Sequence, residues 1–234
     1  MTQLNDLLNS ANHIVFMTGA GVSTASGIPD YRSKNGLYSG MEAPEYLLSD
    51  ECLQREPQKH YDFVTSSMLY PDAKPNVIHE KMAEFAQKKG AQIITQNIDG
   101  LHTKAGTPAE NLVEFHGNLS RVYCQKCGKK ATLAEYQADM HHQNCGGILR
   151  TDIVLYGEPI NEDNLRRSLA AIAAADLLVV VGTSFVVYPF AGLISYRQPQ
   201  AKLAAVNKQQ IALPENGVMI QADAVDEFQA VSVD

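Results

Sequence analysis

The chain has 234 residues, of which 45% are hydrophobic and 19% are charged, so its composition is that of a folded globular protein and not of a disordered one. This length allows one large domain with its own core, alone or carrying a smaller insert. The formal net charge of −7 argues against a uniformly basic face, and we therefore expect no direct nucleic-acid binding.

The first residues are polar and lack the charged-then-apolar layout of an export signal. No apolar run reaches membrane-spanning length, and the strongest run covers only residues 177–181. We therefore expect a cytoplasmic protein without a membrane segment.

Helical and strand patterns alternate along the chain. Apolar periodicity predicts helices over residues 4–11, 77–89, 164–175 and 188–195. Near-continuous apolar runs predict strands buried on both faces over residues 13–18, 92–96, 176–182, 202–207 and 218–222. Such alternation predicts an α/β fold, a Rossmann-like parallel sheet with helices on both faces.

Two segments interrupt this alternation. Residues 30–75 are rich in proline and polar helical stretches, and residues 119–153 contain three of the four cysteines. We expect residues 1–29, 76–118 and 154–234 to form the Rossmann-like domain. Residues 30–75 and 119–153 should then form a smaller domain, composed of a helical module and a zinc ribbon.

A glycine-rich turn, GAGVS at residues 19–23, follows the first predicted strand. Glycines allow a close approach of the backbone to a phosphate, and a following helix would direct its N–H groups at the anion. A plain strand-to-helix turn is the alternative. An ordinary dehydrogenase fits poorly, because Thr24 occupies the usual place of the third glycine and no acidic residue ends a second strand. Asp30 and Arg32 follow in a loop after Pro29, where solvated charges are the alternative.

Polar residues follow several of the other strands. TQNIDGLH spans residues 95–102, EFHGN spans 114–118, GTS spans 182–184, and Asn207 ends a fourth strand. Open α/β sheets bind ligands at the carboxyl ends of their strands, so these residues together mark a cofactor face. Taken singly, Asn97 or Asp99 could cap a helix, and His116 could be a structural histidine.

Three cysteines lie close together in the sequence. Cys124 and Cys127 are separated by two residues, and Cys145 follows. In a chain without an export signal this spacing favours metal ligation over disulfides. Cys52 is remote from the others and is interpreted as a small buried apolar residue.

The motifs GAGVSTASGIPDYRS, TQNIDGLH, HGN, CxxC, YGE, GTS and VN occur in this order between residues 19 and 207. This pattern resembles the sirtuin family, the silent-information-regulator-type NAD-dependent protein deacylases, and in particular a minimal bacterial-like catalytic core. The resemblance implies an enzyme that transfers acyl groups from protein lysine to ADP-ribose, giving nicotinamide and O-acyl-ADP-ribose. It also implies that acyl-lysine peptides bind as an added strand.

The resemblance implies site residues as well. NAD, the cosubstrate, would be held by Gly19, Ala20, Gly21, Ser23, Asp30, Tyr31, Arg32, Gln96, Asn97, Ile98, Asp99, Gly182, Thr183, Ser184, Asn207 and Ala224. Catalysis would depend on His116 and Asn97, with His116 as the general base that activates a ribose hydroxyl. The substrate would contact Tyr156, Gly157, Glu158, Phe185 and Val186. Tyr31 departs from the phenylalanine usual in the family.

A structural Zn²⁺ is implied at Cys124, Cys127, His142 and Cys145. The family usually has a cysteine where His142 stands, but His142 keeps the spacing to Cys145 and zinc accepts imidazole as readily as thiolate. The neighbouring His141 is the rival ligand, and a degenerate ribbon without metal is the other alternative.

The same resemblance limits which acyl groups the enzyme is expected to remove. Desuccinylating relatives share a Tyr-x-x-Arg pair, and the matching positions here are Tyr61 and Val64. Without the arginine, a negatively charged acyl group lacks its bidentate partner, so acetyl and other uncharged groups are expected. Mono-ADP-ribosyl transfer to protein and a non-catalytic NAD-binding module are the alternative functions.

Overall fold

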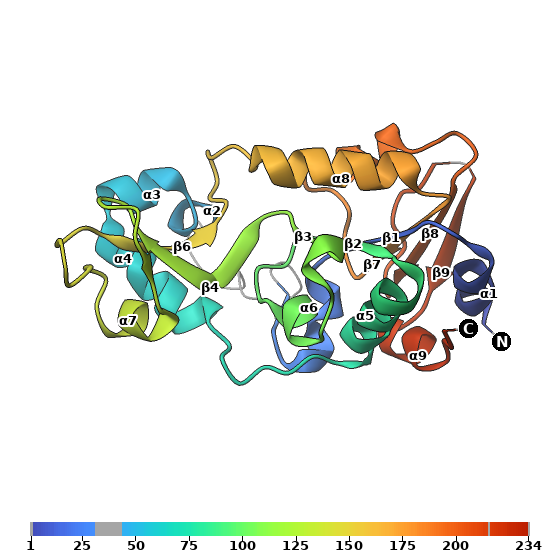
Figure 1. Ribbon diagram of the computed structural model, residues 1–234, viewed down its shortest axis with the longest axis horizontal. Coiled ribbons are helices and arrows are strands. Elements are labelled where there is room, and N and C mark those ends of the chain that lie inside the picture. The colour runs from blue at the N-terminus through green and yellow to red at the C-terminus, as the bar shows by residue number, and fades with distance from the viewer. Residues whose placement is uncertain (1, 31–43, 215, 234) are drawn as a thin grey trace.

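The computed structural model of the protein describes residues 2–30, 44–214 and 216–233, and a six-stranded parallel sheet dominates it (Figure 1). In chain order the strands are β1 Ile14–Thr18, β2 Gln92–Thr95, β3 Leu112–Glu114, β7 Leu177–Val181, β8 Lys202–Asn207 and β9 Gly217–Gln221. Their spatial order is β3-β2-β1-β7-β8-β9. The direction in which strands are added reverses between β1 and β7, which is where open sheets of this kind form a ligand crevice. The predicted fold class is thereby confirmed.

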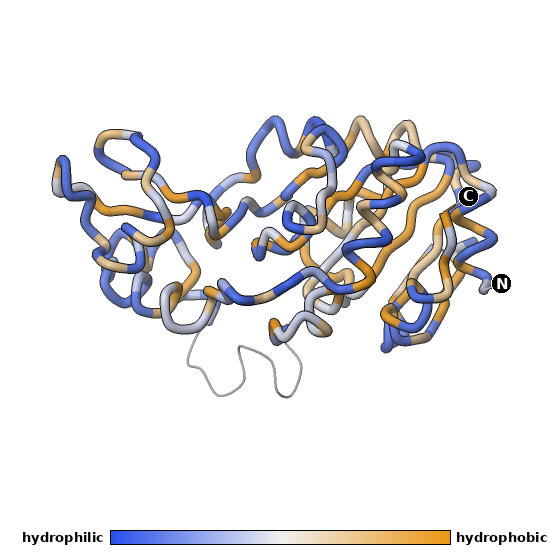
Figure 2. The backbone as a smooth tube through the Cα atoms, turned by 60° about the horizontal axis from the view of Figure 1, so that its bottom comes forward, coloured by the Kyte–Doolittle hydropathy of each residue, from blue (hydrophilic) through white to orange (hydrophobic). Residues whose placement is uncertain are grey.

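The central strands are buried on both faces, as their apolar sequences predict. Every residue of β1 and of β7 is buried. Successive side chains of a strand point to opposite faces, so Ile14 and Phe16 pack on one side of the sheet while Val15 and Met17 pack on the other. Figure 2 shows hydrophobic stretches, in orange, running through the part of the molecule that carries both termini.

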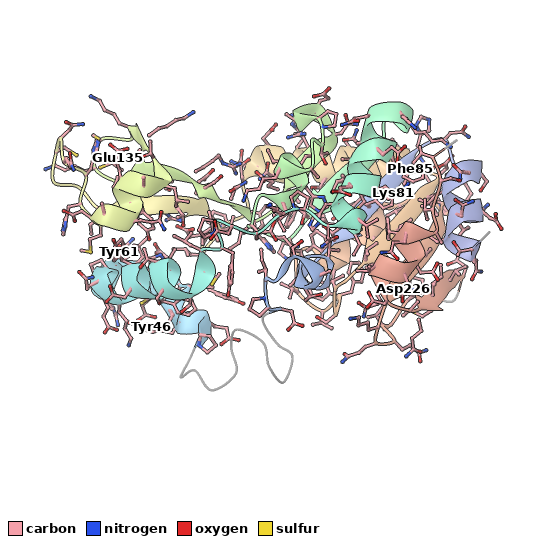
Figure 3. All side chains as sticks on the ribbon, turned by 90° about the horizontal axis from the view of Figure 1, so that it is seen from below. Tyr46, Tyr61, Lys81, Phe85, Glu135 and Asp226 are labelled. Atoms are coloured by element: carbon pink, nitrogen blue, oxygen red, sulfur yellow. The ribbon has the colours of Figure 1, made fainter. Side chains whose placement is uncertain are left out.

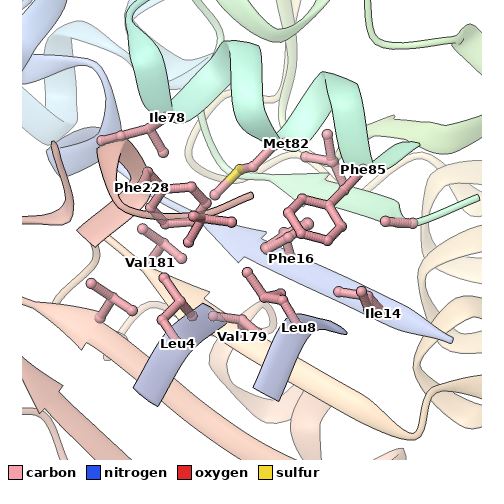
Figure 4. Packing of buried hydrophobic residues seen from close by; sticks show 14 of the residues in the cluster. Leu4, Leu8, Ile14, Phe16, Ile78, Met82, Phe85, Val179, Val181 and Phe228 are labelled. Carbon is pink, nitrogen blue, oxygen red and sulfur yellow. The ribbon is translucent and has the colours of Figure 1, made fainter. Parts of the chain in front are cut away.

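Three helices cover the face of the sheet that carries Phe16. They are α1 Gln3–Ser10, α5 Val77–Lys89 and α9 Ala224–Gln229. The Phe16 ring lies 6.0 Å from that of Phe85 on α5 and 6.1 Å from that of Phe228 on α9, both measured between ring centroids (Figure 4). This packing joins the first and last helices of the chain to the middle of the sheet.

The opposite face is covered by α8 Glu162–Ala174 and by the 3₁₀ helix η5 Ala191–Tyr196. The α-helix predicted over residues 188–195 is therefore wrong in type and in start. The N–H groups of Gly192 and Leu193 donate to the carbonyls of Pro189 and Phe190, three residues back, which tightens the segment into a 3₁₀ turn. Within the described ranges, no helix has the length and apolarity needed to span a membrane.

A second, smaller part of the molecule lies at the end away from the six-stranded sheet (Figure 1). Its helical half contains α2 Pro44–Leu47, α3 Asp50–Arg55, α4 Pro57–Phe63 and the π-helix η3 Val64–Met68. Its other half is an antiparallel sheet of order β5-β4-β6, with β4 Gly117–Cys124, β5 Lys130–Ala131, β6 Leu149–Ile153 and the helix α7 Leu133–Ala138. The two halves share one apolar core. The remaining short helices are η1 Ala20–Val22, η2 Thr24–Ser26, α6 Leu101–Lys104 and η4 Ala109–Asn111.

Strand β4 was not predicted from the sequence, and it crosses the expected boundary between residues 118 and 119. Its pairing with β6 shifts register between Asn118 and Val122, which leaves the successive residues Ser120 and Arg121 both exposed. The alternating pattern of a half-buried strand is therefore interrupted at its centre.

A buried ion pair fixes the chain where β6 leaves the small sheet. The guanidinium of Arg150, whose side chain is only 7% exposed, binds Glu158 through Nη1–Oε1 and Nη2–Oε2 contacts of 2.6 and 3.0 Å. Arg150 also donates to the carbonyl of Ile153, and Glu158 accepts from the N–H of Leu155. These contacts fix the backbone conformation of residues 153–158.

Replacing Arg150 by methionine should leave the partly buried Glu158 carboxylate, whose side chain is 23% exposed, without its cation. We expect the free energy of unfolding, measured by urea titration, to fall by about 3 kcal/mol. The double variant Arg150→Met/Glu158→Gln should recover part of this loss because it no longer contains an unpaired carboxylate. Arg166→Met is the matched control, since Arg166 pairs with Asp163 on the surface and its loss should cost less than about 1 kcal/mol. Equal losses for the two single variants would contradict the assignment.

Candidate functional site

A cleft of about 910 Å³ lies along the carboxyl ends of the sheet strands. It includes the ends of β1 and β7, the two strands between which the direction of strand addition reverses. One wall consists of strand ends, and the facing wall includes Leu48 of the small part and residues 153–160 after β6. Its volume lies in the range that ligand sites of proteins occupy, roughly 300–1,000 Å³.

Most of the residues predicted to hold NAD or substrate line this cleft. They are Ala20, Gly21, Asp30, Gln96, Asn97, Ile98, His116, Tyr156, Gly157, Glu158, Gly182, Thr183, Ser184, Asn207 and Ala224. Five others lie outside the lining, namely Gly19, Ser23, Asp99, Phe185 and Val186. Tyr31 and Arg32 fall outside the described residues.

Several lining residues were not predicted from the sequence. Leu48 and Ile153 contribute apolar surface from the small part, and nothing in their sequence context distinguishes them from ordinary core residues. Lys208 and Asp223 also line the cleft. They follow β8 and β9, so the rule that polar residues after parallel strands face the ligand edge would have found both.

The glycine turn after β1 packs directly against the backbone of the residue that follows β7. The N–H of Gly21 donates to the carbonyl of Gly182 at 2.8 Å, and a Cβ on Gly21 would lie 2.8 Å from that oxygen. Gly182 has φ of 62°, and a Cβ there would lie 2.5 Å from the nitrogen of Val22. The ends of β1 and β7 therefore come together through side-chain-free backbone. The expected helix after this turn is wrong, because two three-residue 3₁₀ helices, η1 and η2, take its place.

A buried polar network lies behind the cleft at the end of β2. The amide nitrogen of Asn97 donates to the carbonyl of Gly19 and to the hydroxyl of Ser23, each at 3.1 Å. That hydroxyl donates to Asp99 at 2.7 Å, and the N–H of Leu101 donates to the same carboxylate. Burial raises the pKa of Asp99, and these two donors partly offset the rise. The network ties the glycine turn to the end of the neighbouring strand.

His116 lines the cleft just before β4 begins. Its Nδ1 lies 3.2 Å from the carbonyl oxygen of Gln96. A carbonyl only accepts, so Nδ1 carries the proton, and in the neutral ring Nε2 has a free lone pair. Burial lowers the pKa of His116, while the contact with Gln96 acts in the opposite direction. A neutral imidazole with a defined tautomer is a competent base.

The cleft has an unpaired polar group and a stretch of bare backbone in its wall. The side-chain nitrogen of Gln96 is buried without a hydrogen-bond partner among the described residues, although Gln96 lines the cleft. Buried polar groups normally find partners, so an unpaired donor here is expected at a site that a polar ligand completes. The backbone of Gly21 and Gly182 supplies surface without side chains at the middle of the cleft.

The far end of the cleft is built by the ends of β8 and β9. Asn207, Lys208, Asp223 and Ala224 line it. The amide nitrogen of Asn207 donates to the carbonyl of Gln209 at 2.8 Å, which fixes the orientation of its side chain. A polar site therefore lies at each end of the cleft, with the glycine contact between them.

The predicted substrate residues flank the cleft entrance. Phe185 has φ of 56°, which is unusual for a residue with a side chain, and its ring packs on Phe190 with centroids 6.2 Å apart. Val186 and Tyr188 are 61% and 77% exposed, and Tyr156, which lines the cleft from the segment after β6, is 44% exposed. The Glu158 carboxylate is bound by Arg150, so it lines the cleft with its charge compensated.

The four predicted metal ligands come together at the tip of the small sheet. Cys124, Cys127, His142 and Cys145 place their ligand atoms within 4.8 Å of one another. Burial would raise the pKa of Cys124, but hydrogen bonds from backbone N–H groups and neighbouring thiols lower it to about 6. Three sulfurs and one imidazole nitrogen are the donor set of a closed, structural zinc site.

The structure separates the two candidate histidines. Nδ1 of His142 lies 3.3 Å from the sulfurs of both Cys127 and Cys145, and Asn144 contacts its other ring nitrogen. His141 is exposed and pairs with Asp139 at 3.1 Å. His142 is therefore the residue that completes the cluster.

The positions that match the carboxylate-binding pair lie away from the cleft. The hydroxyl of Tyr61 donates to the carbonyl of Gln137, and its ring packs on Tyr136. Val64 is fully buried in the core of the small part. Neither side chain presents a cation to an acyl group.

A family model described as the Sir2 family matches residues 19–189. The chain is 57% identical over 231 residues to an NAD-dependent protein deacetylase of Listeria monocytogenes serotype 4b, and the match covers 99% of this chain and 100% of that protein. The chain belongs to the Sir2 family. The predicted resemblance is confirmed.

Solved Sir2 structures share this fold. One, a complex of Sir2 with deacetylated p53 peptide and 3′-O-acetyl-ADP-ribose, has a TM-score of 0.88 and 32% identity, covering 97% of this chain and 95% of that one. Another, of Sir2 with p53 peptide and NAD⁺, has a TM-score of 0.85 and 32% identity, covering 98% and 95%. The similarity extends over the entire cleft and the small part.

Freshly purified protein should contain one zinc ion per chain, measured by atomic emission. His142→Ala should lose most of the metal and lower the thermal midpoint, because binding of structural zinc contributes to folding. His141→Ala is the matched control and should keep its zinc. Retention of full zinc by His142→Ala, or its loss by His141→Ala, would show that the imidazole at residue 142 is not a ligand.

Proposed function

We propose that this Sir2 chain removes acetyl groups from lysine side chains of proteins, with NAD as cosubstrate and with nicotinamide and O-acetyl-ADP-ribose as products. The observation that carries the proposal is His116, which lines the cleft as a base of defined tautomer. The Listeria relative is named an NAD-dependent protein deacetylase, and one solved relative holds a deacetylated peptide with acetyl-ADP-ribose.

His116 is the proposed general base. When bound, NAD supplies a ribose carbon that releases nicotinamide and becomes bonded to the acyl oxygen of the lysine substrate. Nε2 of His116 then accepts the proton of a ribose hydroxyl, whose oxygen attacks the acyl carbon. The bond from that carbon to the lysine nitrogen breaks and free lysine leaves. Water then adds to the acyl carbon, whose bond to the first ribose oxygen breaks, and O-acetyl-ADP-ribose is the product. The Gln96 carbonyl keeps Nδ1 protonated, so that Nε2 is the nitrogen that accepts the proton.

Asn97 and Asp99 are proposed to shape the nicotinamide end of the site. Both protons of the Asn97 amide are committed to Gly19 and Ser23, which leaves its amide oxygen for a ligand. Asp99 holds Ser23 and thereby the turn that contains Gly21. We assign Asn97 to catalysis through its contact with the ribose, and Ile98 and Asp99 to the carboxamide.

The remaining NAD contacts are assigned along the cleft. The pyrophosphate is assigned to the two glycine segments, because the backbone at the middle of the cleft carries no side chains there. The adenosine is assigned to the far end of the cleft. The assigned residues that line the cleft are Ala20, Gly21, Asp30, Gln96, Gly182, Thr183, Ser184, Asn207 and Ala224. Gly19 and Ser23, which lie just outside the lining and accept from the Asn97 amide, are assigned to the same cofactor site. Tyr31 and Arg32 keep their sequence-based assignment to the cofactor loop.

We propose that the acyl-lysine peptide lies between residues 156–158 and 184–187 as an added strand. The exposed apolar side chains of Tyr156, Val186 and Tyr188 on either side support this placement. Backbone hydrogen bonds would supply much of the affinity, which predicts loose sequence selectivity. Lys208 is the one lysine or arginine in the part of the cleft lining that the structure describes, so a negatively charged acyl group would lack a cation near residues 156–158 and uncharged groups are favoured.

We also propose that residues 1–29, 76–118 and 154–234 act as the NAD-binding domain, and residues 30–75 and 119–153 as the small domain. The cleft between them supports this division, since Leu48 and Ile153 face the strand ends. The proposed compartment is the cytoplasm, and the proposed partners are proteins, because a net charge of −7 disfavours nucleic acid.

Zinc is assigned a structural role. Cys124 lies at the end of β4, and His142 and Cys145 lie between α7 and β6. When bound, the metal would link these segments in addition to the backbone pairing of Cys124 with Leu149. Four protein ligands leave no open coordination position for substrate.

Incubation of the protein with NAD and an acetyl-lysine peptide should yield O-acetyl-ADP-ribose, detected by mass spectrometry. His116→Ala should lower the rate at least about 100-fold, because a positioned general base contributes roughly 10²–10⁴. His141→Ala, far from the cleft, should retain full activity. Nicotinamide release without an acylated peptide would favour mono-ADP-ribosyl transfer, and NAD binding without any product would favour a binding module.

The acid limb of kcat/KM against pH should lie below pH 6.5. His116 must be neutral to accept a proton, and burial lowers its pKa from the ordinary 6.5, so the active form persists to more acidic pH. The rate should therefore fall only as the pH drops through the depressed pKa. A profile measured between about pH 5 and pH 9 reports this value for the free enzyme. An acid limb centred above pH 6.5 would be inconsistent with His116 as the base.

A further inference from the structure

The two ends of the cleft lie over different strands. His116 stands between β3 and β4, at one edge of the sheet, whereas Asn207, Lys208 and Asp223 stand at the ends of β8 and β9, at the other edge. The contact of Gly21 with Gly182 lies between them. If His116 acts on the nicotinamide ribose, as proposed above, the adenosine half of NAD must extend toward β8 and β9.

An ion pair closes that adenosine end. Nζ of Lys208 lies 2.9 Å from Oδ2 of Asp223, joining the loop after β8 to the loop after β9. The other carboxylate oxygen of Asp223 accepts from the N–H of Val225 at 3.0 Å and so caps α9. Lys208 and the Val225 N–H together lower the pKa of Asp223, so the carboxylate is ionised at neutral pH. Asp223 is thus held at the cleft wall, whereas the Lys208 side chain is 70% exposed.

The charges at this end discriminate against an anion. Among the described residues that line the cleft, Lys208 is the one lysine or arginine, and Asp223 already neutralises it. Asp226 and Glu227 add further negative charge in the first turn of α9, the helix that Asp223 caps; Figure 3 shows Asp226 on this helix. A ribose hydroxyl is neutral and can donate to a carboxylate, but a phosphate on that hydroxyl carries nearly two negative charges. In Rossmann dinucleotide sites, a carboxylate hydrogen-bonded to the ribose 2′-hydroxyl goes with NAD, whereas an arginine accommodates the 2′-phosphate of NADP. Asp223 comes from a different strand end but would act by the same chemistry.

We infer that the Lys208–Asp223 pair determines cofactor choice, with the Asp223 carboxylate rejecting the 2′-phosphate of NADP. This inference rests on the proposed function, because it requires NAD in the cleft with its adenosine toward β8 and β9. Asp223 is a specificity residue in this role and takes no part in the reaction at the nicotinamide ribose.

The test compares two ligands that bind without reacting, ADP-ribose and its 2′-phosphate, by isothermal titration calorimetry. Wild-type protein should prefer ADP-ribose. Asp223→Asn removes the charge and keeps a good helix cap, since asparagine and aspartate cap about equally well. It also frees Lys208, so the ratio of the two dissociation constants should shift toward the 2′-phosphate by roughly fivefold, as expected for a partly exposed charge contact. Lys208→Gln should shift the ratio in the opposite direction.

Asp226→Asn is the matched control, because it removes the same charge from the same helix at a residue outside the cleft lining. An unchanged ratio in Asp223→Asn, or an equal shift in Asp226→Asn, would overturn the inference. Wild-type protein that deacetylates with NAD while Asp223→Asn shows no shift would refute the inference and leave the proposed function standing. Wild-type protein that binds neither ligand would refute both.

Discussion

The structure depends on one close contact between two stretches of backbone. Gly21 and Gly182 meet where β1 and β7 end, at a separation that no side chain would permit. This contact places the polar residues after both strands along a single cleft. A Cβ at either glycine would force the strand ends apart and would displace Asn97, which is hydrogen-bonded to Gly19 in the same turn. The packing of these two backbone segments therefore determines where the side chains of the site lie.

Around this contact the polar residues hold one another in place. Asn97, Ser23 and Asp99 form a chain of hydrogen bonds that satisfies buried groups which would otherwise be costly. His116 is oriented in the same way by a main-chain carbonyl. The result is preorganisation: the groups that would contact NAD are already fixed by neighbours that do not line the cleft, such as Ser23 and Asp99.

Much of this could be predicted from the sequence, for identifiable reasons. Long apolar runs marked the central strands because burial on both faces removes polar residues from them. The polar strand ends and the Cys-x-x-Cys spacing carried strong local signals. Strand β3 was too short to recognise, and the irregular register of β4 hid its alternation. The contact partner of Gly21 lies 161 residues away, so local sequence indicated a phosphate loop but not the glycine packing. Choosing His142 over His141 likewise required the fold.

Strand β4 begins beside His116 and ends at Cys124. At about 3.3 Å per residue, its eight residues span at most roughly 25 Å, and they connect the proposed base with the metal cluster without a break in the chain. The other end of the strand is held by its pairing with β6 at Leu149 and Arg150. A zinc ion bound at Cys124 would therefore fix the far end of the same strand that begins beside His116, so the metal site and the cleft share one structural element.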